Sequence, residues 1–204
     1  MIAPGTGLGE AYLVWDGAGY RGLPSEGGHA SFAPRTEVEI DLLRSLSARF
    51  GHVSYERVCS GSGIPNLFGF FRDRHPDELD PAVAAAVDAA VDAAADAAPL
   101  ILAAALDPTG ADAVCRRTIE TFVSILGAET GNLALKLLAT GGMYLAGGIP
   151  PRIVPLLRSE RFRATYSHKG RFGAMVEAIP VHVVLEPGTG LLGAAVLGLA
   201  TDLG

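Results

Sequence analysis

Lysine and basic charge are scarce in this sequence. Only Lys136 and Lys169 among the 16 basic residues are lysines, and 22 acidic residues leave a net charge of -6. Proteins that bind nucleic acids or anionic membranes usually present a basic surface. We therefore expect neither partner, and we expect arginine and backbone amides to make most contacts with any phosphate group.

Cysteines and long apolar runs are also few. Cys59 and Cys115 stand far apart, without the spacing of a disulfide framework or a zinc site, so we expect reduced thiols. The first nine residues lack the basic and apolar pattern of a signal peptide, and no run of about 20 residues has the composition of a membrane span. These absences predict a cytoplasmic protein.

Familiar catalytic and nucleotide motifs are absent as well. The sequence contains no GxxxxGK[ST] and no HExxH, and Gly5-Thr6-Gly7-Leu8-Gly9 has Glu10 where the third glycine of GxGxxG belongs. Ser60 and Ser62 lack the leading glycine of a GxSxG elbow. A P-loop, a dinucleotide fingerprint and an α/β-hydrolase nucleophile are therefore excluded.

Glycine turns and apolar periodicity predict an α/β domain. Thr36 with Glu39 forms a capping box for one helix, and Gly51 ends that helix. The order is three strands, several helices, and two strand-helix units, which indicates a mixed sheet flanked by helices. The expected strands are 1–3, 10–16, 20–23, 143–146 and 179–185, and the expected helices are 36–50, 64–72, 80–98, 111–140, one starting at 150, and 191–201.

Three aspartates recur every four residues in the alanine-rich segment 80–98. Asp88, Asp92 and Asp96 would share one face of a peripheral helix. Carboxylates in such a row could bind a metal ion, and this is the more specific alternative. Aspartates at this spacing more often form a solvent-exposed face of a helix. We expect no metal site here.

Several short motifs follow one another in a fixed order. They are Gly5-Thr6-Gly7-Leu8-Gly9, Glu26-Gly27-Gly28-His29, Phe32-Ala33-Pro34, Ser54-Tyr55-Glu56-Arg57, Leu145-Ala146-Gly147-Gly148-Ile149, Lys169-Gly170-Arg171-Phe172 and Pro187-Gly188-Thr189-Gly190-Leu191-Leu192-Gly193. Together they resemble the bacterial glucokinase family. The resemblance implies a ribonuclease H-like fold of the actin and hexokinase type, with residues 1–204 as the large carboxyl-terminal domain of an incomplete enzyme.

The resemblance implies that two glycine segments contact ATP. Gly5, Thr6, Gly7 and Gly9 match the family's second phosphate-binding element, and Gly147 and Gly148 match its adenosine-contact turn. Glycines let backbone amides approach an anion, and Thr6 adds a hydroxyl donor. A glycine-lined anion site would also accept ADP or polyphosphate, and taken alone each segment is an ordinary tight turn.

Glu26, His29 and Glu56 match the positions that bind glucose in this family. Carboxylates accept charge-assisted hydrogen bonds from adjacent sugar hydroxyls, and imidazole donates or accepts one. Taken singly, Glu26 would be interpreted as a turn residue, His29 as a core histidine and Glu56 as an acidic residue at the start of a helix. A related branch of sugar kinases pairs such a histidine with a cysteine cluster to bind zinc, but Cys59 and Cys115 form no cluster after His29, so we expect no metal ligands.

The family's catalytic Asn-Asp pair and first phosphate loop have no match in this sequence. The base would take the proton of the sugar 6-hydroxyl, and the loop would help to place Mg²⁺. We therefore expect this chain to bind glucose and ATP with little kinase activity of its own, and to expose an apolar surface that favours a homodimer. The alternative is a non-catalytic sugar-binding or regulatory remnant of a sugar kinase.

Overall fold

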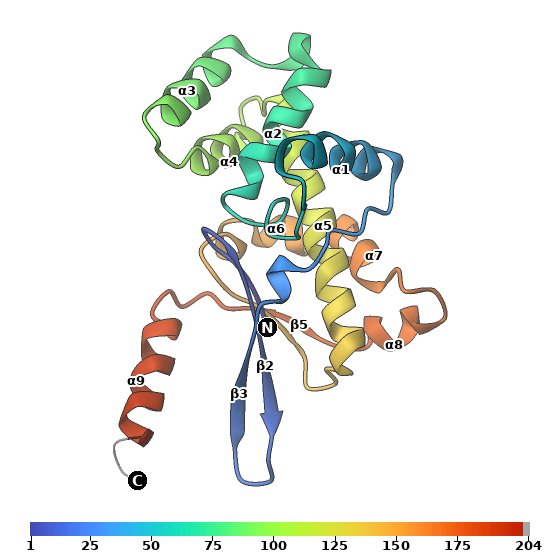
Figure 1. Cartoon of the computed structure of the whole chain (residues 1–204), viewed down its shortest axis with the longest axis vertical. Coiled ribbons are helices and arrows are strands. Elements are labelled where there is room, and N and C mark those ends of the chain that lie inside the picture. The colour runs from blue at the N-terminus through green and yellow to red at the C-terminus, as the bar shows by residue number, and fades with distance from the viewer. Residues whose placement is uncertain (202–204) are drawn as a thin grey trace.

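The computed structural model describes residues 1–201 and is built on a five-stranded mixed sheet (Figure 1). The strand order is β3-β2-β1-β4-β5. Strand β2 runs antiparallel to both β1 and β3, whereas β4 is parallel to both β1 and β5. The bounds are β1 Ile2–Pro4, β2 Leu8–Trp15, β3 Tyr20–Ser25, β4 Met143–Leu145 and β5 Val181–Val183.

The β2–β3 hairpin reaches well beyond the rest of the sheet (Figure 1). Asp16 starts its turn, because one carboxylate oxygen accepts the amide hydrogens of Ala18 and Gly19 at 3.0 Å each. These hydrogen bonds lower the pKa of Asp16. The short polar side chain thus specifies the turn locally, as expected for Asp before glycine.

Helices surround α5, the longest helix of the described chain. Asp112 caps its start by accepting the amide hydrogen of Cys115, and Leu138 ends it in a left-handed conformation with φ 47°. The bounds are α1 Glu37–Phe50, α2 Gly63–Arg74, α3 Pro81–Asp92, α4 Ala98–Leu106, α5 Ala113–Leu137, α6 Val154–Leu157, α7 Glu160–Ser167, α8 Gly173–Glu177 and α9 Thr189–Thr201. Short 3₁₀ helices cover η1 Gly27–His29, η2 Pro76–Glu78, η3 Pro150–Arg152 and η4 Gly170–Phe172.

A single hydrophobic core joins the sheet to these helices. Ile2 and Met143 contribute from the sheet, and Phe68 and Phe122 contribute from α2 and α5, all with 2% exposure or less. Side chains of this size stabilise a fold by about 1.5–3 kcal/mol each when buried. Cys59 and Cys115 are buried and free, as the sequence predicted.

The predicted single helix over 80–98 is wrong. Helix α3 ends at Asp92, Ala94 takes a left-handed conformation with φ 54°, and α4 starts at Ala98. Asp88 pairs with Arg72 of α2 at 2.7 Å, and Asp96 accepts the amide hydrogen of Ala98. The three aspartates therefore have different roles, because tertiary packing interrupts a segment that alanine content alone makes helical.

Other boundaries differ more modestly from the sequence prediction. Gly9 lies within β2, where it pairs with Ala3, and is not part of the turn. The predicted helix 111–140 is shorter, at Ala113–Leu137, and the strand expected at 179–185 spans only Val181–Val183. Helices α7 and α8 were not predicted from the sequence. The mixed sheet flanked by helices is confirmed.

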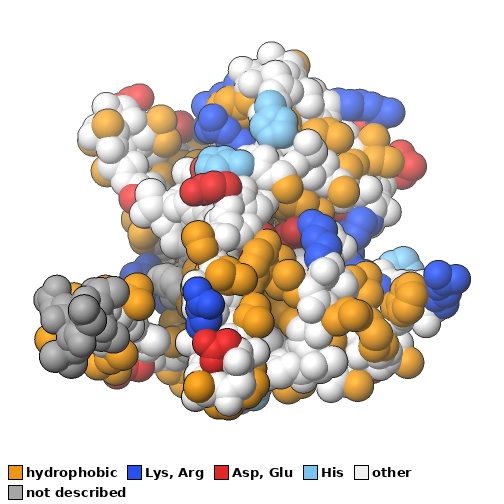
Figure 2. Space-filling model, turned by 60° about the horizontal axis from the view of Figure 1, so that its bottom comes forward, with side chains coloured by type: hydrophobic (Ala, Val, Ile, Leu, Met, Phe, Trp, Pro, Cys, Tyr) orange, Lys and Arg blue, Asp and Glu red, His pale blue; other side chains and the backbone are white. Residues whose placement is uncertain are grey.

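Large apolar side chains are exposed on the hairpin and on α9. They are Leu13, Val14, Trp15, Tyr20 and Leu23 on the hairpin, and Leu191, Leu192, Val196, Leu197 and Leu199 on α9. Figure 2, which looks toward the lower end of the molecule, shows hydrophobic side chains over much of that face. Among residues 1–201, no helix has both the length and the apolar character needed to cross a bilayer.

Candidate functional site

The Gly5–Gly7 turn connects β1 to β2 and is fixed to a second glycine-rich segment. The amide of Gly61 donates to the carbonyl of Gly5 at 2.7 Å, and the amide of Ser62 donates to the carbonyl of Thr6 at 3.1 Å. Ser60, just before them, is fully buried. Thr6 remains exposed, so its hydroxyl is available to a ligand above a turn that the protein holds in one shape.

The Gly147-Gly148 turn lies beside the first turn. Strand β4 runs parallel to β1, and both strands end at the same edge of the sheet. The amide of Ile149 donates to the carbonyl of Pro4 at 3.4 Å. Gly147 has φ 86°, and a Cβ there would lie 2.5 Å from the carbonyl oxygen of Pro4. Ligands of open α/β sheets commonly bind at this strand edge.

Glu26 precedes the short helix η1, and His29 is its last residue. Their carboxylate and imidazole are 3.9 Å apart, and the side chains are 92% and 61% exposed. The amide of His29 donates to the carbonyl of Glu26 at 3.0 Å, which closes the turn. Both polar groups therefore face solvent from one small loop, where they can reach the same ligand.

Glu56 joins this loop to the Gly5–Gly7 turn. Its amide donates to the carbonyl of Gly28 at 2.9 Å, and its Oε2 accepts the amide hydrogen of Leu8 at 3.0 Å. A Cβ on Gly7 would lie 2.5 Å from the same oxygen. The structure thus brings Glu26, His29 and Glu56 together next to the glycine turn.

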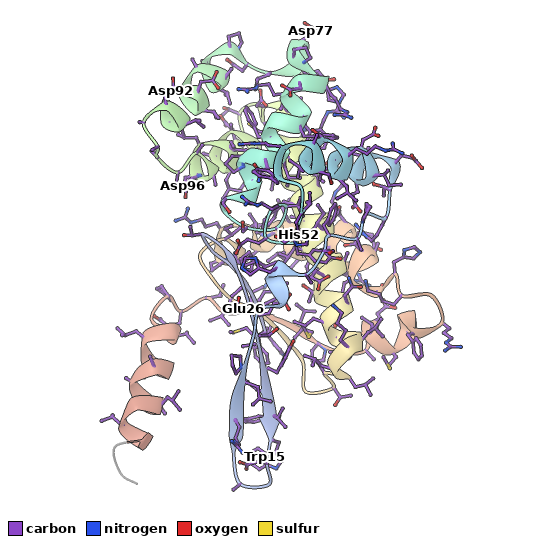
Figure 3. The ribbon with its side chains drawn as sticks, in the orientation of Figure 1. Trp15, Glu26, His52, Asp77, Asp92 and Asp96 are labelled. Carbon is purple, nitrogen blue, oxygen red and sulfur yellow. The ribbon has the colours of Figure 1, made fainter. Side chains whose placement is uncertain are left out.

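His52 also belongs to this neighbourhood, and sequence reasoning missed it. Its Nε2 lies 3.1 Å from the carbonyl oxygen of His29. Figure 3 shows Glu26 and His52 near the middle of the molecule, whereas Asp92 and Asp96 lie on its upper left side. The only sequence signal that could have indicated His52 is its position directly after Gly51, where helix α1 ends. Within residues 1–201, no group of three or more His, Cys, Asp or Glu side chains could hold a metal ion.

A partly buried polar network contacts Tyr55, the residue before Glu56. Asn132 of α5 donates to the hydroxyl of Tyr55 at 3.1 Å and to Oε2 of Glu129 at 2.8 Å. Its Oδ1 accepts a hydrogen bond from Nζ of Lys169 at 2.7 Å. Burial raises the pKa of Tyr55 well above its usual value, and Glu129 adds to that rise. In the sequence, Lys169 belongs to one of the family motifs but gives no sign of this contact. No motif or spacing in the sequence indicates that Asn132 takes part.

Two carboxylates near this network have unpartnered oxygens. Oε1 of Glu10 and Oε1 of Glu129 are buried without a hydrogen-bond partner in the described structure. Burial raises the pKa of Glu10, and the negative charge of Glu129 raises it further. Lys136 partly compensates, since its Nζ lies 3.7 Å from Oε1 of Glu129.

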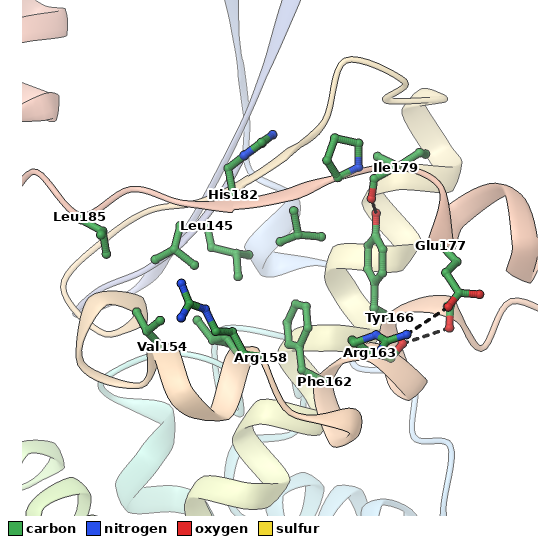
Figure 4. A pocket seen from close by; sticks show the side chains of 15 residues that line it. Leu145, Val154, Arg158, Phe162, Arg163, Tyr166, Glu177, Ile179, His182 and Leu185 are labelled. Carbon is green, nitrogen blue, oxygen red and sulfur yellow. Dashed lines mark hydrogen bonds and ion pairs between the residues drawn. The ribbon is translucent and has the colours of Figure 1, made fainter.

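Two hollows of the structure lie away from the candidate site. A cavity of about 540 Å³ lies between β5 and the helices α6 and α7, with Arg158, Phe162 and His182 in its wall (Figure 4). A groove of about 650 Å³ runs between α1, α5 and α7. Neither is lined by a predicted site residue.

A family model described as Glucokinase matches residues 1–201. The chain is 42% identical to a glucokinase from Trichormus variabilis, over 96% of this chain and 59% of that protein. It is 43% identical to a glucokinase from Chromobacterium violaceum, over 96% of this chain and 51% of that protein. The chain thus spans little more than half the length of these relatives.

Solved structures of glucokinases are also similar to this chain in fold. A crystal structure of glucokinase from an Antarctic psychrotroph superposes with a TM-score of 0.74 at 34% identity, over 95% of this chain and 55% of that one. A glucokinase from Streptomyces griseus in complex with glucose and AMPPNP gives 0.61 at 21% identity, over 96% and 58%. The second likeness concerns the fold alone.

Proposed function

This chain belongs to the glucokinase family, and we propose that it forms the glucose- and ATP-binding large domain of an enzyme that phosphorylates glucose at its 6-hydroxyl. The observation that supports this most directly is the position of Glu56. Its backbone bonds to the Glu26–His29 loop, and its carboxylate bonds to the Gly5–Gly7 turn. The proposed sugar site and the proposed phosphate site would therefore both contact Glu56.

In this proposal Glu26, His29 and Glu56 bind the sugar hydroxyls. Oε1 of Glu56 is left for a hydroxyl, because Oε2 already accepts the amide hydrogen of Leu8. Glu26 and His29 have exposed polar atoms 3.9 Å apart, a separation that two neighbouring hydroxyls of one hexose can bridge. A carboxylate left without its hydroxyl partner would be costly, so the site would favour the matching sugar.

The two glycine turns would bind the nucleotide. The Thr6 hydroxyl and the amide of Gly7 would face the phosphates. The amide of Gly5 already donates to the carbonyl of Gly7 at 2.9 Å, so Gly5 would shape the turn, with Gly9 supporting it from β2. Gly147 and Gly148 would lie beside the adenosine. The AMPPNP bound by the Streptomyces griseus glucokinase supports ATP as donor. Two fixed turns at one strand edge are pre-organised, so little loop ordering would oppose binding.

Mg²⁺ would not be held by side chains of the described residues alone, among which no cluster of three or more His, Cys, Asp or Glu could ligate a metal. Proteins usually bind Mg²⁺ through substrate phosphates and one or two carboxylates, and the ion neutralises charge during phosphoryl transfer. This part of the chain would contribute the Thr6 hydroxyl at most. No step of the proposal depends on the ion.

The proton acceptor for the 6-hydroxyl is proposed to lie outside the three sugar-binding residues. Glu26, His29 and Glu56 would each be engaged with other hydroxyls, and no Asn-Asp pair occurs in the sequence. These residues would then position the sugar and leave proton transfer to another part of the whole protein. Glucose-dependent ATP turnover by this chain should therefore stay near background.

Calorimetric titration of this chain with glucose, mannose and glucosamine tests the sugar site. We expect glucose binding, and we expect Glu26→Gln, His29→Ala and Glu56→Gln each to weaken it about tenfold or more, as for lost hydrogen bonds to charged groups. Glu37→Gln, an exposed acid of α1, is the matched control and should leave binding unchanged.

Two outcomes would contradict the proposal. Equal affinity of all three site variants and the parent would remove these residues from the sugar site. Vigorous ATP turnover by this chain would place the catalytic base within it. A third outcome decides between the two hypotheses. If this chain binds glucose without ATP turnover and the whole protein turns over ATP normally, the chain is the binding domain of an enzyme and not a non-catalytic remnant.

A further inference from the structure

We propose that Asn132 and Lys169 are positioning residues for the sugar-binding carboxylate of Glu56, acting through the side chain of Tyr55. This inference rests on the proposed function, since it assigns a purpose to Glu56. It concerns residues of α5 and of the loop after α7, which lie far from the sugar-binding loops in the sequence.

Asn132 uses every polar atom of its side chain in this network. Its amide nitrogen donates to Tyr55 and to Glu129, and its oxygen accepts from Lys169. Nζ of Lys169 donates a second bond to the carbonyl oxygen of Ala128 at 2.8 Å. A side-chain amide satisfied at both ends can adopt only one orientation, and it therefore fixes the Tyr55 hydroxyl that it bonds.

Tyr55 transmits this constraint to Glu56. Its ring is buried, with 3% exposure, and lies edge-on to Phe32 with ring centroids 5.7 Å apart. Its amide donates to the carbonyl of Ala30, and the next amide, of Glu56, donates to the carbonyl of Gly28. A Tyr55 that is held at its hydroxyl, its ring and its amide leaves the adjoining Glu56 little freedom.

The arrangement is costly, which argues for a role beyond stability. Burial lowers the pKa of Lys169 to about 8, and the nearby Arg35 and Lys136 lower it while Glu129 opposes them. Oε1 of the fully buried Glu129 has no hydrogen-bond partner in the described structure. Apolar side chains of similar volume usually stabilise a core at least as well as such groups.

Helix α5 also provides the space for Lys169. A Cβ on Gly131 would lie 2.5 Å from Cε of Lys169 and would also overlap the carbonyl oxygen of Tyr166. The aliphatic part of Lys169 therefore runs directly over the helix backbone and delivers Nζ to Asn132. The Lys169 loop and the sugar-binding segment are thus joined through one turn of α5.

The test measures glucose affinity by calorimetry, and amide hydrogen exchange at Glu56, in this chain. Asn132→Ala and Lys169→Met should each weaken glucose binding about fivefold to tenfold, as for the loss of one or two partly buried hydrogen bonds. Exchange at Glu56 should become faster in both. Tyr55→Phe should have the same effect, and combining it with Asn132→Ala should add little, because the two changes break one connection.

Arg116→Met is the matched control. Arg116 lies on the same helix, is exposed, and has no side-chain contact with Asn132, Tyr55, Glu129 or Lys169 in the described structure. It should leave both readouts unchanged. Measurements are made well below the unfolding temperature of each variant, so that a loss of stability alone does not alter the affinity.

The outcomes separate this inference from the proposed function. If the parent binds glucose and the Asn132 and Lys169 variants bind it within twofold, the positioning role is overturned. If the parent binds no glucose, the proposed sugar site fails, and the exchange rate at Glu56 alone then decides whether the network restrains this residue. Unchanged exchange in that case also overturns the inference.

Discussion

The carboxylate of Glu56 accepts the backbone amide hydrogen of Leu8 at 3.0 Å, although 48 residues separate them. One side chain of the proposed sugar site therefore also fixes the strand that leaves the proposed phosphate turn. Sugar and phosphate contacts would not vary independently, because a shift of this carboxylate moves both.

Gly7→Ala tests this connection. Its Cβ would lie 2.5 Å from Oε2 of Glu56, so the carboxylate would have to leave Leu8. We expect glucose affinity to fall about tenfold with the loss of that charge-assisted hydrogen bond. Gly5→Ala is the control in calorimetry, since nothing lies within 4 Å of a Cβ there. Equal glucose affinity of the two variants would show that the Gly5–Gly7 turn does not affect the sugar site.

Gly147→Ala and Gly148→Ala should differ sharply in stability. Gly147 combines φ 86° with close approach to Pro4, whereas a Cβ on Gly148 meets nothing within 4 Å. Strain of this kind costs about 1–3 kcal/mol. Urea unfolding monitored by circular dichroism should show that loss for Gly147→Ala and a change below about 0.5 kcal/mol for Gly148→Ala. Equal midpoints would contradict the strained turn at Gly147.

Glu10→Gln should stabilise the chain at neutral pH. Glu10 is 6% exposed, its Oε1 has no partner in the described structure, and burial raises its pKa. Removing a buried charge that Lys136 and the amino terminus compensate only in part should raise the free energy of unfolding by about 1 kcal/mol at pH 7.

The pH dependence of the Glu10 effect has a definite sign. Because the folded-state pKa is raised, the parent binds this proton more readily when folded, and its stability falls as pH rises above the ordinary value of 4.5. The advantage of Glu10→Gln should therefore vanish at lower pH. The exposed Asp73→Asn is a control that should show no such trend, and a destabilised Glu10→Gln at pH 7 would contradict the prediction.

Lys169→Met should change the pH profile of stability in the opposite direction. Burial lowers the folded-state pKa of Lys169 from 10.5 to about 8, so the folded chain releases this proton first. The penalty for burying the charge is complete below pH 8 and is relieved as pH rises toward 10.5. The parent should therefore gain stability relative to Lys169→Met across that interval, as measured by urea unfolding at several pH values. A constant difference would show that Lys169 does not titrate there.

Local signals predicted the parts of the fold that depend on neighbouring residues. The Thr36 cap is observed, with its side chain accepting the amide hydrogen of Glu39 at 3.2 Å. Both glycine turns are observed, although the first is shorter than predicted because Gly9 belongs to β2. At Gly147 few other residues would tolerate the backbone angle and the close contact with Pro4. The alanine-rich segment was mispredicted because helix propensity contains no information about the packing that separates α3 from α4.

The candidate site divides in the same way. Glu26 and His29 lie in one short loop, and their proximity follows from the sequence because one turn contains both. The bond from Asn132 to Tyr55 joins residues 77 positions apart, and no local pattern encodes it. Likewise, Glu10 and Glu129 give no sign in the sequence that burial will leave an oxygen of each without a partner.

Most turns, the order of the strands along the chain and the family could be inferred from the amino acids in their order, since turns and strands depend on backbone preferences and on residues close together in the chain. Helices α7 and α8 and the break between α3 and α4 could not be inferred in this way. The hydrogen bond from Leu8 to Glu56, and the path of Lys169 over Gly131 to Asn132, are visible only in the folded chain. Such contacts form when core packing brings distant segments together, and their cost or benefit depends on the burial that results.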